Sequence, residues 1–425
     1  MSGIKQAEST FRSGASSITA SASRITGSLT RLIGVGAGLY ALKRGIQSAV
    51  GAFASFDEAL RNVWTLTGET WEQMQKVGQE VRDLAPKFGI TGTEATKALY
   101  QIYSAGYKGA EGIEVLKASL VGAAAGLTDV FTAADATTSI LNAYKMSADK
   151  ASYVNDVLFK TVERGKTTFG ELSSSIGRLI GIAAPLGAGF EEVTAALATL
   201  TRQGISTDEA VTAVRQAIVQ LARPTEETAK VIEALGYESG TAMMEELGFA
   251  EALAKVTDYA KEHNIALSDM FTNIRAVLAV LPLATTSADE YAEDMKEIAN
   301  ATGAAARAFE KQKGLAFQLR QIKAQFSEIA TTLGEEFLPE INRMLRVVQS
   351  TIEPLSKMGS ALKDIVTLLG TTSLGALFGG TSGAAVGGII GGLIVLVDMI
   401  QEVVNSLKET NIEVAPCKLK MLKRL

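Results

Sequence analysis

The sequence is poor in the residues on which most metal sites and many catalytic sites depend. Its 425 residues include one histidine, His263, and one cysteine, Cys417. A single histidine excludes zinc motifs that need two histidines, and a single cysteine excludes an internal disulfide bond. Sparse cysteine is also typical of a reducing compartment. We therefore predict no catalytic, cofactor-binding or metal-binding residues, and no enzyme activity.

Two short motifs have ordinary structural explanations. Gly165-Lys166-Thr167 resembles the end of a phosphate-binding loop, but Lys160 stands where that loop requires its first glycine. Thr168 and Glu171 instead form the pattern of a helix start. His263 lies in a polar stretch, and we interpret it as a residue at a helix end.

Proline and period-two patterns are scarce as well. The chain has 7 prolines against 40 glycines, and almost no stretch alternates apolar with polar residues. A sheet is therefore not expected. Charged residues are 20% and hydrophobic residues 47% of the chain, and the net charge is −5. This balance is typical of a packed helical protein and gives no indication of a specific nucleic-acid sequence as partner.

Between residues 51 and 304 the sequence predicts one helix after another. Four capping-box patterns mark helix starts; they are Thr91–Glu94, Thr168–Glu171, Ser206–Glu209 and Ser287–Glu290. Apolar residues follow the starts at spacings of three and four, which places them on one helix face. Stretches beginning at Gly89, Gly126 and Gly204 look like variants of one unit. Because their intervals are irregular, we predict an irregular array of αα-hairpins and not a regular solenoid.

From about residue 305 the pattern becomes that of amphipathic helices. Six apolar residues alternate spacings of four and three, as in the heptads of a coiled coil; they are Leu315, Leu319, Ile322, Phe326, Ile329 and Leu333. This seam covers nearly three heptads, so it fits either a short coiled coil or a helix packing on the preceding array. We expect Gly334 to Pro339 to interrupt the helix and a second amphipathic helix to follow.

A glycine ladder lies inside an uncharged run, residues 365–397. Its members are Gly375, Gly379, Gly383, Gly387 and Gly391. In a helix they would form one stripe of bare backbone. Each helical glycine costs about 1 kcal/mol relative to alanine in water, whereas in a bilayer such a stripe lets helices approach closely. We predict a transmembrane segment, as one tilted helix or a bent pair; the alternative is a glycine-rich hinge or a buried soluble hairpin.

The predicted fold class is all-α, an irregular array of αα-hairpins followed by amphipathic helices and a glycine-rich apolar segment. The chain divides into a low-complexity helical lead (1–50), an all-helical core (51–304) and amphipathic or short coiled-coil helices (305–360). A candidate membrane segment (361–400) and a polar, basic tail (401–425) follow.

Segments between residues 56 and 339 resemble the core region of phage tail tape-measure proteins of long-tailed phages and prophages. The resemblance begins at Phe56-Asp-Glu-Ala-Leu-Arg-Asn-Val63. It is clearest at Leu197-Ala-Thr-Leu-Thr-Arg-Gln-Gly-Ile-Ser206 and at Ala234-Leu-Gly236, and it returns at Leu333-Gly-Glu-Glu-Phe-Leu-Pro339. The order and spacing of these segments carry it, and no single motif is diagnostic.

The resemblance implies a structural virion component, made in the host bacterial cytoplasm and located in the tail-tube lumen. Such a protein sets tail length during assembly and helps DNA cross the host membrane on ejection. The implied partners are further copies of itself, tail assembly chaperones, the tail tube protein, tail tip or baseplate proteins and the host membrane. Family members are usually much longer than this chain. Four explanations for the difference stay open: a short-tailed particle, a degraded prophage copy, a section of a split gene or a truncated chain.

Two other hypotheses remain open from the sequence. In the first, the protein is a membrane-inserting, pore-forming toxin or effector, and the helical block is a soluble carrier for the glycine ladder. In the second, it is a cell-wall hydrolase built into a tail, against which the scarcity of histidine argues. Pore formation by the isolated protein would favour the first, and activity on peptidoglycan the second.

Overall fold

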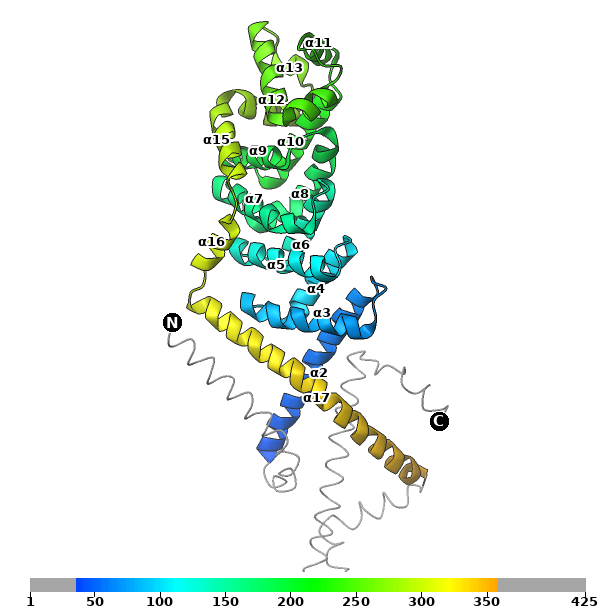
Figure 1. Ribbon diagram of the computed structural model, residues 1–425. Helices are drawn as coiled ribbons and strands as arrows, with labels where there is room; N and C mark the ends of the chain where they lie inside the picture. The colour runs from blue at the N-terminus through cyan, green and yellow to red at the C-terminus, as the bar shows by residue number, and fades with distance from the viewer. Residues whose placement is uncertain (1–35, 358–425) are drawn as a thin grey trace, which may run out of the picture. The chain divides into compact units, whose positions relative to one another are not determined.

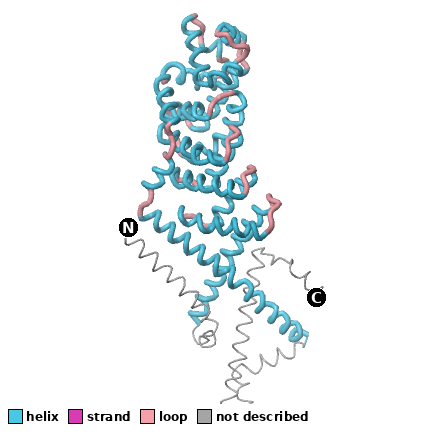
Figure 2. The backbone as a smooth tube through the Cα atoms, in the orientation of Figure 1, coloured by secondary structure: helices cyan, strands magenta, loops and turns pink. Residues whose placement is uncertain are grey.

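The computed structural model describes residues 36–357, and within them every regular element is a helix (Figure 1, Figure 2). The chain forms two compact units. The larger is Ser55–Glu328, and the smaller includes residues 36–54 and 329–357 of the described part. The prediction of an all-α fold is confirmed for these residues.

The helices follow one another with short connections. They are α2 (Gly36–Trp64), α3 (Trp71–Leu84), α4 (Gly92–Ser104), α5 (Gly109–Gly126), α6 (Val130–Ala143), α7 (Ala151–Arg164), α8 (Phe169–Ala183), α9 (Phe190–Arg202), α10 (Thr207–Ala222), α11 (Glu226–Ala234), α12 (Gly240–Glu262), α13 (Leu267–Met270), α14 (Ile274–Leu281), α15 (Ala288–Ala299), α16 (Ala304–Lys311) and α17 (Leu315–Lys357). Shorter turns are η1 (Ala85–Phe88), η2 (Ala148–Lys150), η3 (Ala184–Leu186) and the π-helical η4 (Pro282–Thr286).

The larger unit stacks its helices in two rows. In one row α4, α6, α8, α10 and α14 each pack on the next, and in the other α5, α7, α9 and α15 do the same. Helices α4, α6, α8 and α10 begin at residues 92, 130, 169 and 207, so their starts are 38, 39 and 38 residues apart. This part is a regular solenoid of αα-hairpins, and the expected irregularity is wrong for α4 to α10. The sequence pattern misses the unit at Gly165 because Lys166 stands where Ile or Leu follows the glycine in the other three.

Side-chain caps fix where the helices of the first row begin. Complete capping boxes join Thr91 to Glu94 and Thr168 to Glu171, as predicted. Ser206 accepts the N–H of Glu209 without a full box, and Asp129 starts α6 by accepting the N–H of Thr132 at 2.8 Å. Each cap satisfies a backbone donor that the helix leaves open. The caps therefore set the register of the repeats.

The predicted capping box at Ser287 is wrong. Its side chain makes no cap for α15. Instead, the Ser287 hydroxyl accepts a hydrogen bond from the Gln203 side chain, which follows α9. A contact with a residue distant in sequence has replaced the local one.

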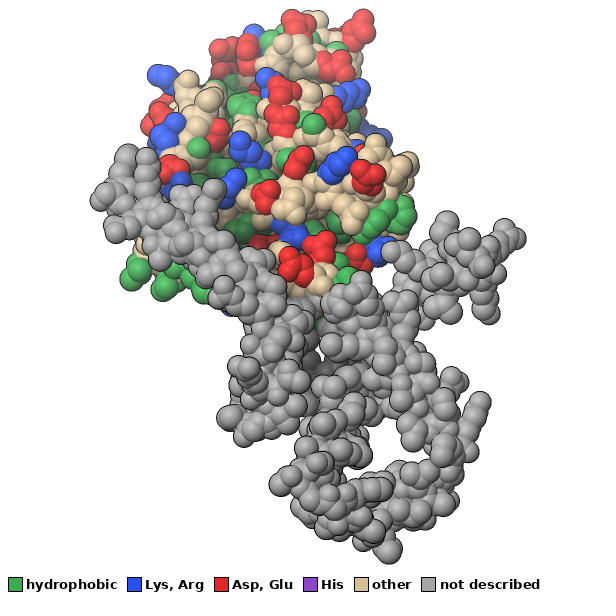
Figure 3. All heavy atoms as spheres, turned by 60° about the horizontal axis from the view of Figure 1, so that its bottom comes forward, with side chains coloured by type: hydrophobic (Ala, Val, Ile, Leu, Met, Phe, Trp, Pro, Cys, Tyr) green, Lys and Arg blue, Asp and Glu red, His purple; other side chains and the backbone are tan. Residues whose placement is uncertain are grey.

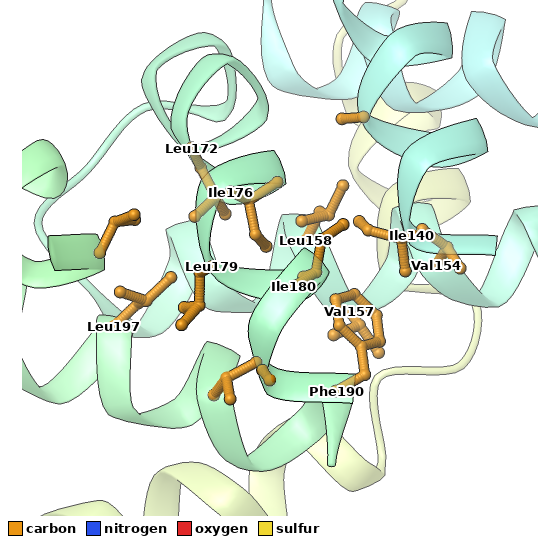
Figure 4. Packing of buried hydrophobic residues seen from close by; sticks show 14 of the residues in the cluster. Ile140, Val154, Val157, Leu158, Leu172, Ile176, Leu179, Ile180, Phe190 and Leu197 are labelled. Carbon is orange, nitrogen blue, oxygen red and sulfur yellow. The ribbon is translucent and has the colours of Figure 1, made fainter. Parts of the chain in front are cut away.

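Small residues let neighbouring helices approach closely, both within a row and between the two rows. Gly122 on α5 lies against α7, where a Cβ would be 2.0 Å from Oδ1 of Asn155. At Gly126 a Cβ would be 2.3 Å from Cγ of Phe169. Beside these contacts runs a continuous apolar core (Figure 4). The part shown there includes Ile140 of α6, Val154, Val157 and Leu158 of α7, Leu172, Ile176, Leu179 and Ile180 of α8, and Phe190 and Leu197 of α9.

Helix α17 is continuous over 43 residues, so the expected interruption at Gly334–Pro339 is wrong. Within the smaller unit Gly334 lies against α2, because a Cβ there would be 2.1 Å from the backbone oxygen of Ala49. The glycine thus permits a close helix–helix contact. Pro339 removes one backbone donor without ending the helix.

The glycine ladder, the rest of the 361–400 segment, the 401–425 tail and Cys417 lie outside the described residues. Among the helices of residues 36–357, none is both long enough and apolar enough to cross a membrane. The transmembrane segment stays a prediction.

Candidate functional site: the return segment and the α17 stripe

His263 and the stretch after Gly165 both have structural roles. His263 is the C-cap residue of α12, and its ring stacks on Tyr259 with 3.8 Å between ring centroids. Thr168 caps α8, so the stretch after Gly165 is a helix start. Both interpretations are confirmed. Within residues 36–357, no group of three or more His, Cys, Asp or Glu side chains is placed to hold a metal ion.

The larger unit contains a return segment, which we define as residues 288–328. It comprises α15, α16 and the first turns of α17. Figure 1 shows α15 and α16 running along one side of the stack. Helix α15 packs on α9 and α7, and α16 packs on α7 and α5. As the chain runs from α15 to α16, the return segment therefore contacts the later repeats first and the earlier repeats afterwards.

Asp294 anchors α15. Its fully buried carboxylate accepts hydrogen bonds from Arg164 of α7 (2.7 Å, Nε to Oδ1) and from Thr199 and Arg202 of α9 (2.7 and 2.8 Å to Oδ2). A buried carboxylate is tolerated only when its oxygens are paired, and here two guanidinium groups and a hydroxyl pair them. The hydrogen bond to Asp294 is the main cause that raises the pKa of Arg164. One side chain thus joins three helices.

Tyr291 gives α15 a second attachment. Its ring is buried, and its hydroxyl donates to the backbone oxygen of Glu192 at 3.1 Å. Burial raises the pKa of Tyr291 well above its ordinary value, so the ring stays neutral. The Glu192 side chain in turn accepts the N–H groups of Phe249 and Ala250 at 2.9 and 3.2 Å, inside α12. These contacts tie α9, α12 and α15 together.

Asp156 of α7 holds the start of α16. Its two carboxylate oxygens accept the N–H of Gly303 at 2.6 Å and of Ala305 at 2.9 Å. A carboxylate at this position also interacts favourably with the helix dipole. The cap comes from a residue about 150 positions away, so it is a tertiary contact and not a local one.

Glu328 fastens the first turns of α17 to the beginning of the array. Its carboxylate accepts a hydrogen bond from Nε of Arg82, on α3, at 3.0 Å. It also accepts the N–H of Gly92, the first residue of α4, at 2.6 Å. The return segment thus reaches from α9 back to α3 and α4.

The outer side of the first turns of α17 carries an apolar stripe. Four seam residues are exposed: Leu315 (73%), Leu319 (57%), Ile322 (45%) and Phe326 (58%). We call these four residues the α17 stripe. Phe317 on the same helix is 3% exposed and packs in the larger unit. Helix α17 thus packs on the array through Phe317 and not through these four residues, and the coiled coil stays a prediction. Ile329 and Leu333 belong to the smaller unit.

Acidic and basic side chains are interspersed on the face shown in Figure 3. Exposed ion pairs join residues within one helix, such as Lys230 with Glu226 on α11, or residues on neighbouring helices, such as Arg178 of α8 with Asp208 of α10. Exposed pairs of this kind contribute about 0–1 kcal/mol each. The buried carboxylates of the return segment are therefore the more consequential charges.

Known proteins similar to this chain agree with the resemblance seen in the sequence. Residues 72–273 match the family described as phage-related minor tail protein. The chain is 26% identical over 360 residues to a probable tape measure protein of Clostridium phage phiCD119. It is 22% identical over 354 residues to a tape measure protein of Pneumococcus phage Dp-1. The resemblance to tape measure proteins is confirmed.

These tape measure relatives are considerably longer than the aligned part. The two alignments cover 81% and 79% of this chain but only 38% and 30% of the relatives. The minor tail protein match runs from α3 to the residue before α14, which includes the regular repeats. The return segment lies after it. No solved structure matches the chain.

Proposed function

We propose that this chain acts as a tail tape measure protein, which occupies the lumen of the tail tube and sets the length of the tail. The observation that carries the proposal is the match of residues 72–273 to minor tail proteins, joined by two relatives that bear the tape measure name. Both relatives favour this function over the pore-forming toxin. The test is the length of tails built with an α17 of altered length.

Helix α17 suits a ruler because it converts residues into length at a fixed rate. A helix rises 1.5 Å per residue, so the 43 residues of α17 span about 65 Å. Stacked repeats, by contrast, add little length per residue. We therefore assign length measurement to the extended helical parts of the chain, and attachment to tail proteins to the repeats. Chaperones, tube protein and tip or baseplate proteins are the partners that this role requires.

We assign self-association to the α17 stripe. Heptad spacing suits a second helix of the same kind, and exposed apolar patches of this sort mark interaction sites. Replacing Leu319 and Ile322 together with glutamate is expected to weaken self-association at least about tenfold, because each buried aliphatic side chain contributes about 1.5–3 kcal/mol. Sedimentation velocity of the full chain measures the effect.

The matched control adds the same charge at apolar residues outside the stripe. Phe131 and Ile274 are 43% and 79% exposed, and their double glutamate variant should associate like the unmodified protein. Equal association of the stripe variant and the unmodified protein would remove the stripe from the interface.

The glycine ladder is proposed to help DNA cross the host membrane during ejection. A peptide covering residues 362–405 is expected to make lipid vesicles leak. The same peptide with Gly383→Leu and Gly387→Leu should bind vesicles equally but leak less, because leucine blocks close helix approach while it raises hydrophobicity. Equal leakage from both would exclude helix packing through the glycines, and no leakage from either would exclude the membrane role.

A further inference from the structure

The return segment has two parts that differ in how they are attached. Helix α15 places Tyr291, Ile298 and the following Ala301 in the main apolar core of the larger unit. Beyond it, residues 302–328 contribute to a second cluster, which meets the main core only at the half-buried Phe88 and Phe159. We call residues 302–328 the arm. The arm can leave the repeats without opening the main core, whereas α15 cannot.

The second cluster is small. Its buried members are Ala125 of α5 with Ala305, Phe309 and Phe317 of the arm. Phe309 packs edge-on against Phe317 and stacks on Phe88 of η1, with 5.3 Å between centroids in both pairs. An apolar contact of this size is far smaller than the core between the two rows. Polar contacts therefore contribute to the hold on the arm beside this cluster.

Those polar contacts stand at the two ends of the arm. At its start, Asp156 accepts the N–H groups of Gly303 and Ala305. At its end, Glu328 is held by Arg82 and by the N–H of Gly92. Between them, Gln312 and Gln321 donate to the backbone oxygens of Ala125 and Lys87, both outside the arm, at 2.7 and 2.8 Å. The arm is fastened by two carboxylates, one at each end.

The junction with α15 is suited to act as a hinge. Gly303 has φ +77°, a left-handed conformation that glycine adopts without strain. It lies directly before α16, and its own N–H is one of the two that Asp156 accepts. On the other side of the junction, α15 stays anchored by Asp294. At its start the arm is therefore joined to the anchored α15 by one short connection.

We propose that the arm is a latch: residues 302–328 detach from the repeat array as one unit, while α15 and both helix rows stay folded. Detachment frees the first turns of α17, uncovers Phe88 and Ala125, and breaks the link that the arm makes between α7 and the start of α4. All the contacts that hold the latch lie within the larger unit, and the latch does not depend on the proposed tail function. The two carboxylates set how often the latch opens.

Hydrogen–deuterium exchange on the full chain tests the latch. Asp156→Ala removes both acceptors at the start of the arm. Backbone amides of residues 304–328 are expected to exchange at least about tenfold faster in this variant, because hydrogen bonds to a charged group are worth at least that factor. Amides of α8, α9 and α10 should keep the rates of the unmodified protein. Glu328→Gln, at the other end, should have the same effect on the arm.

Asp208→Ala serves as the matched control. It removes an exposed carboxylate, paired with Arg178, from the array itself, and it should leave the arm unchanged. Faster exchange in the array as well as in the arm would show that the two open together and would overturn the latch. Unchanged exchange in the arm of both carboxylate variants would overturn it too.

Discussion

Replacing Gly240 with alanine is expected to lower the free energy of unfolding of the larger unit by about 3 kcal/mol, at the upper end of what overpacking usually costs. Gly240 is the first residue of α12, and it packs directly on the backbone of α10. A Cβ at this position would lie 1.7 Å from the backbone oxygen of Leu221 and 2.7 Å from its carbonyl carbon. Both atoms belong to backbone, so no side chain can turn away to make room. One of the two helices has to shift.

Replacing a glycine elsewhere in the array with alanine is expected to raise the free energy of unfolding instead. Gly177 lies inside α8, and a Cβ there would meet nothing within 4 Å. Gly177→Ala should therefore stabilise the protein by about 1 kcal/mol, because alanine is the better helix former. Urea denaturation followed by circular dichroism measures both changes. A Gly240→Ala protein as stable as Gly177→Ala would mean that α12 does not pack on α10 as described.

The sequence allowed the class of fold and many helix boundaries to be predicted, because both depend on local chemistry. The cap at Thr91 lies three residues from its partner Glu94, and both residues are visible in one short window. The constant spacing of the repeats was missed because two of the units depart from the local sequence pattern. Asp129 caps α6 without a capping box, and Lys166 breaks the pattern at the third unit.

The return segment could not be predicted, because its contacts join residues far apart in the sequence. Asp294 meets Arg164 across 130 positions, and Glu328 meets Arg82 across 246. Nothing near Asp294 distinguishes it from the exposed acidic residues of the same helix. Ser287 shows the same effect, since its distant partner Gln203 replaces the cap that the local sequence favours. The one signal in the sequence was the heptad seam, because it contains more apolar residues than the larger unit buries.

Helix α17 gives the tape measure proposal its most direct test. Four heptads of helix-forming sequence, inserted between residues 345 and 346, should lengthen α17 by about 42 Å at 1.5 Å per residue. Each heptad turns the faces of a straight helix by about 20°, so the four heptads together turn the flanking faces by about 80°. The matched control places the same insertion at Gly68, in the loop between α2 and α3. This position is exposed, and a Cβ added there would meet nothing within 4 Å.

The measurement is tail length, by electron microscopy, in particles whose only source of this protein is the variant. Tails about 42 Å longer are expected with the α17 insertion, because each added residue contributes its helical rise, and unchanged tails are expected with the loop insertion. Tails of unchanged length with the α17 insertion would contradict the tape measure proposal. Equal lengthening by both insertions would contradict the assignment of the ruler to α17.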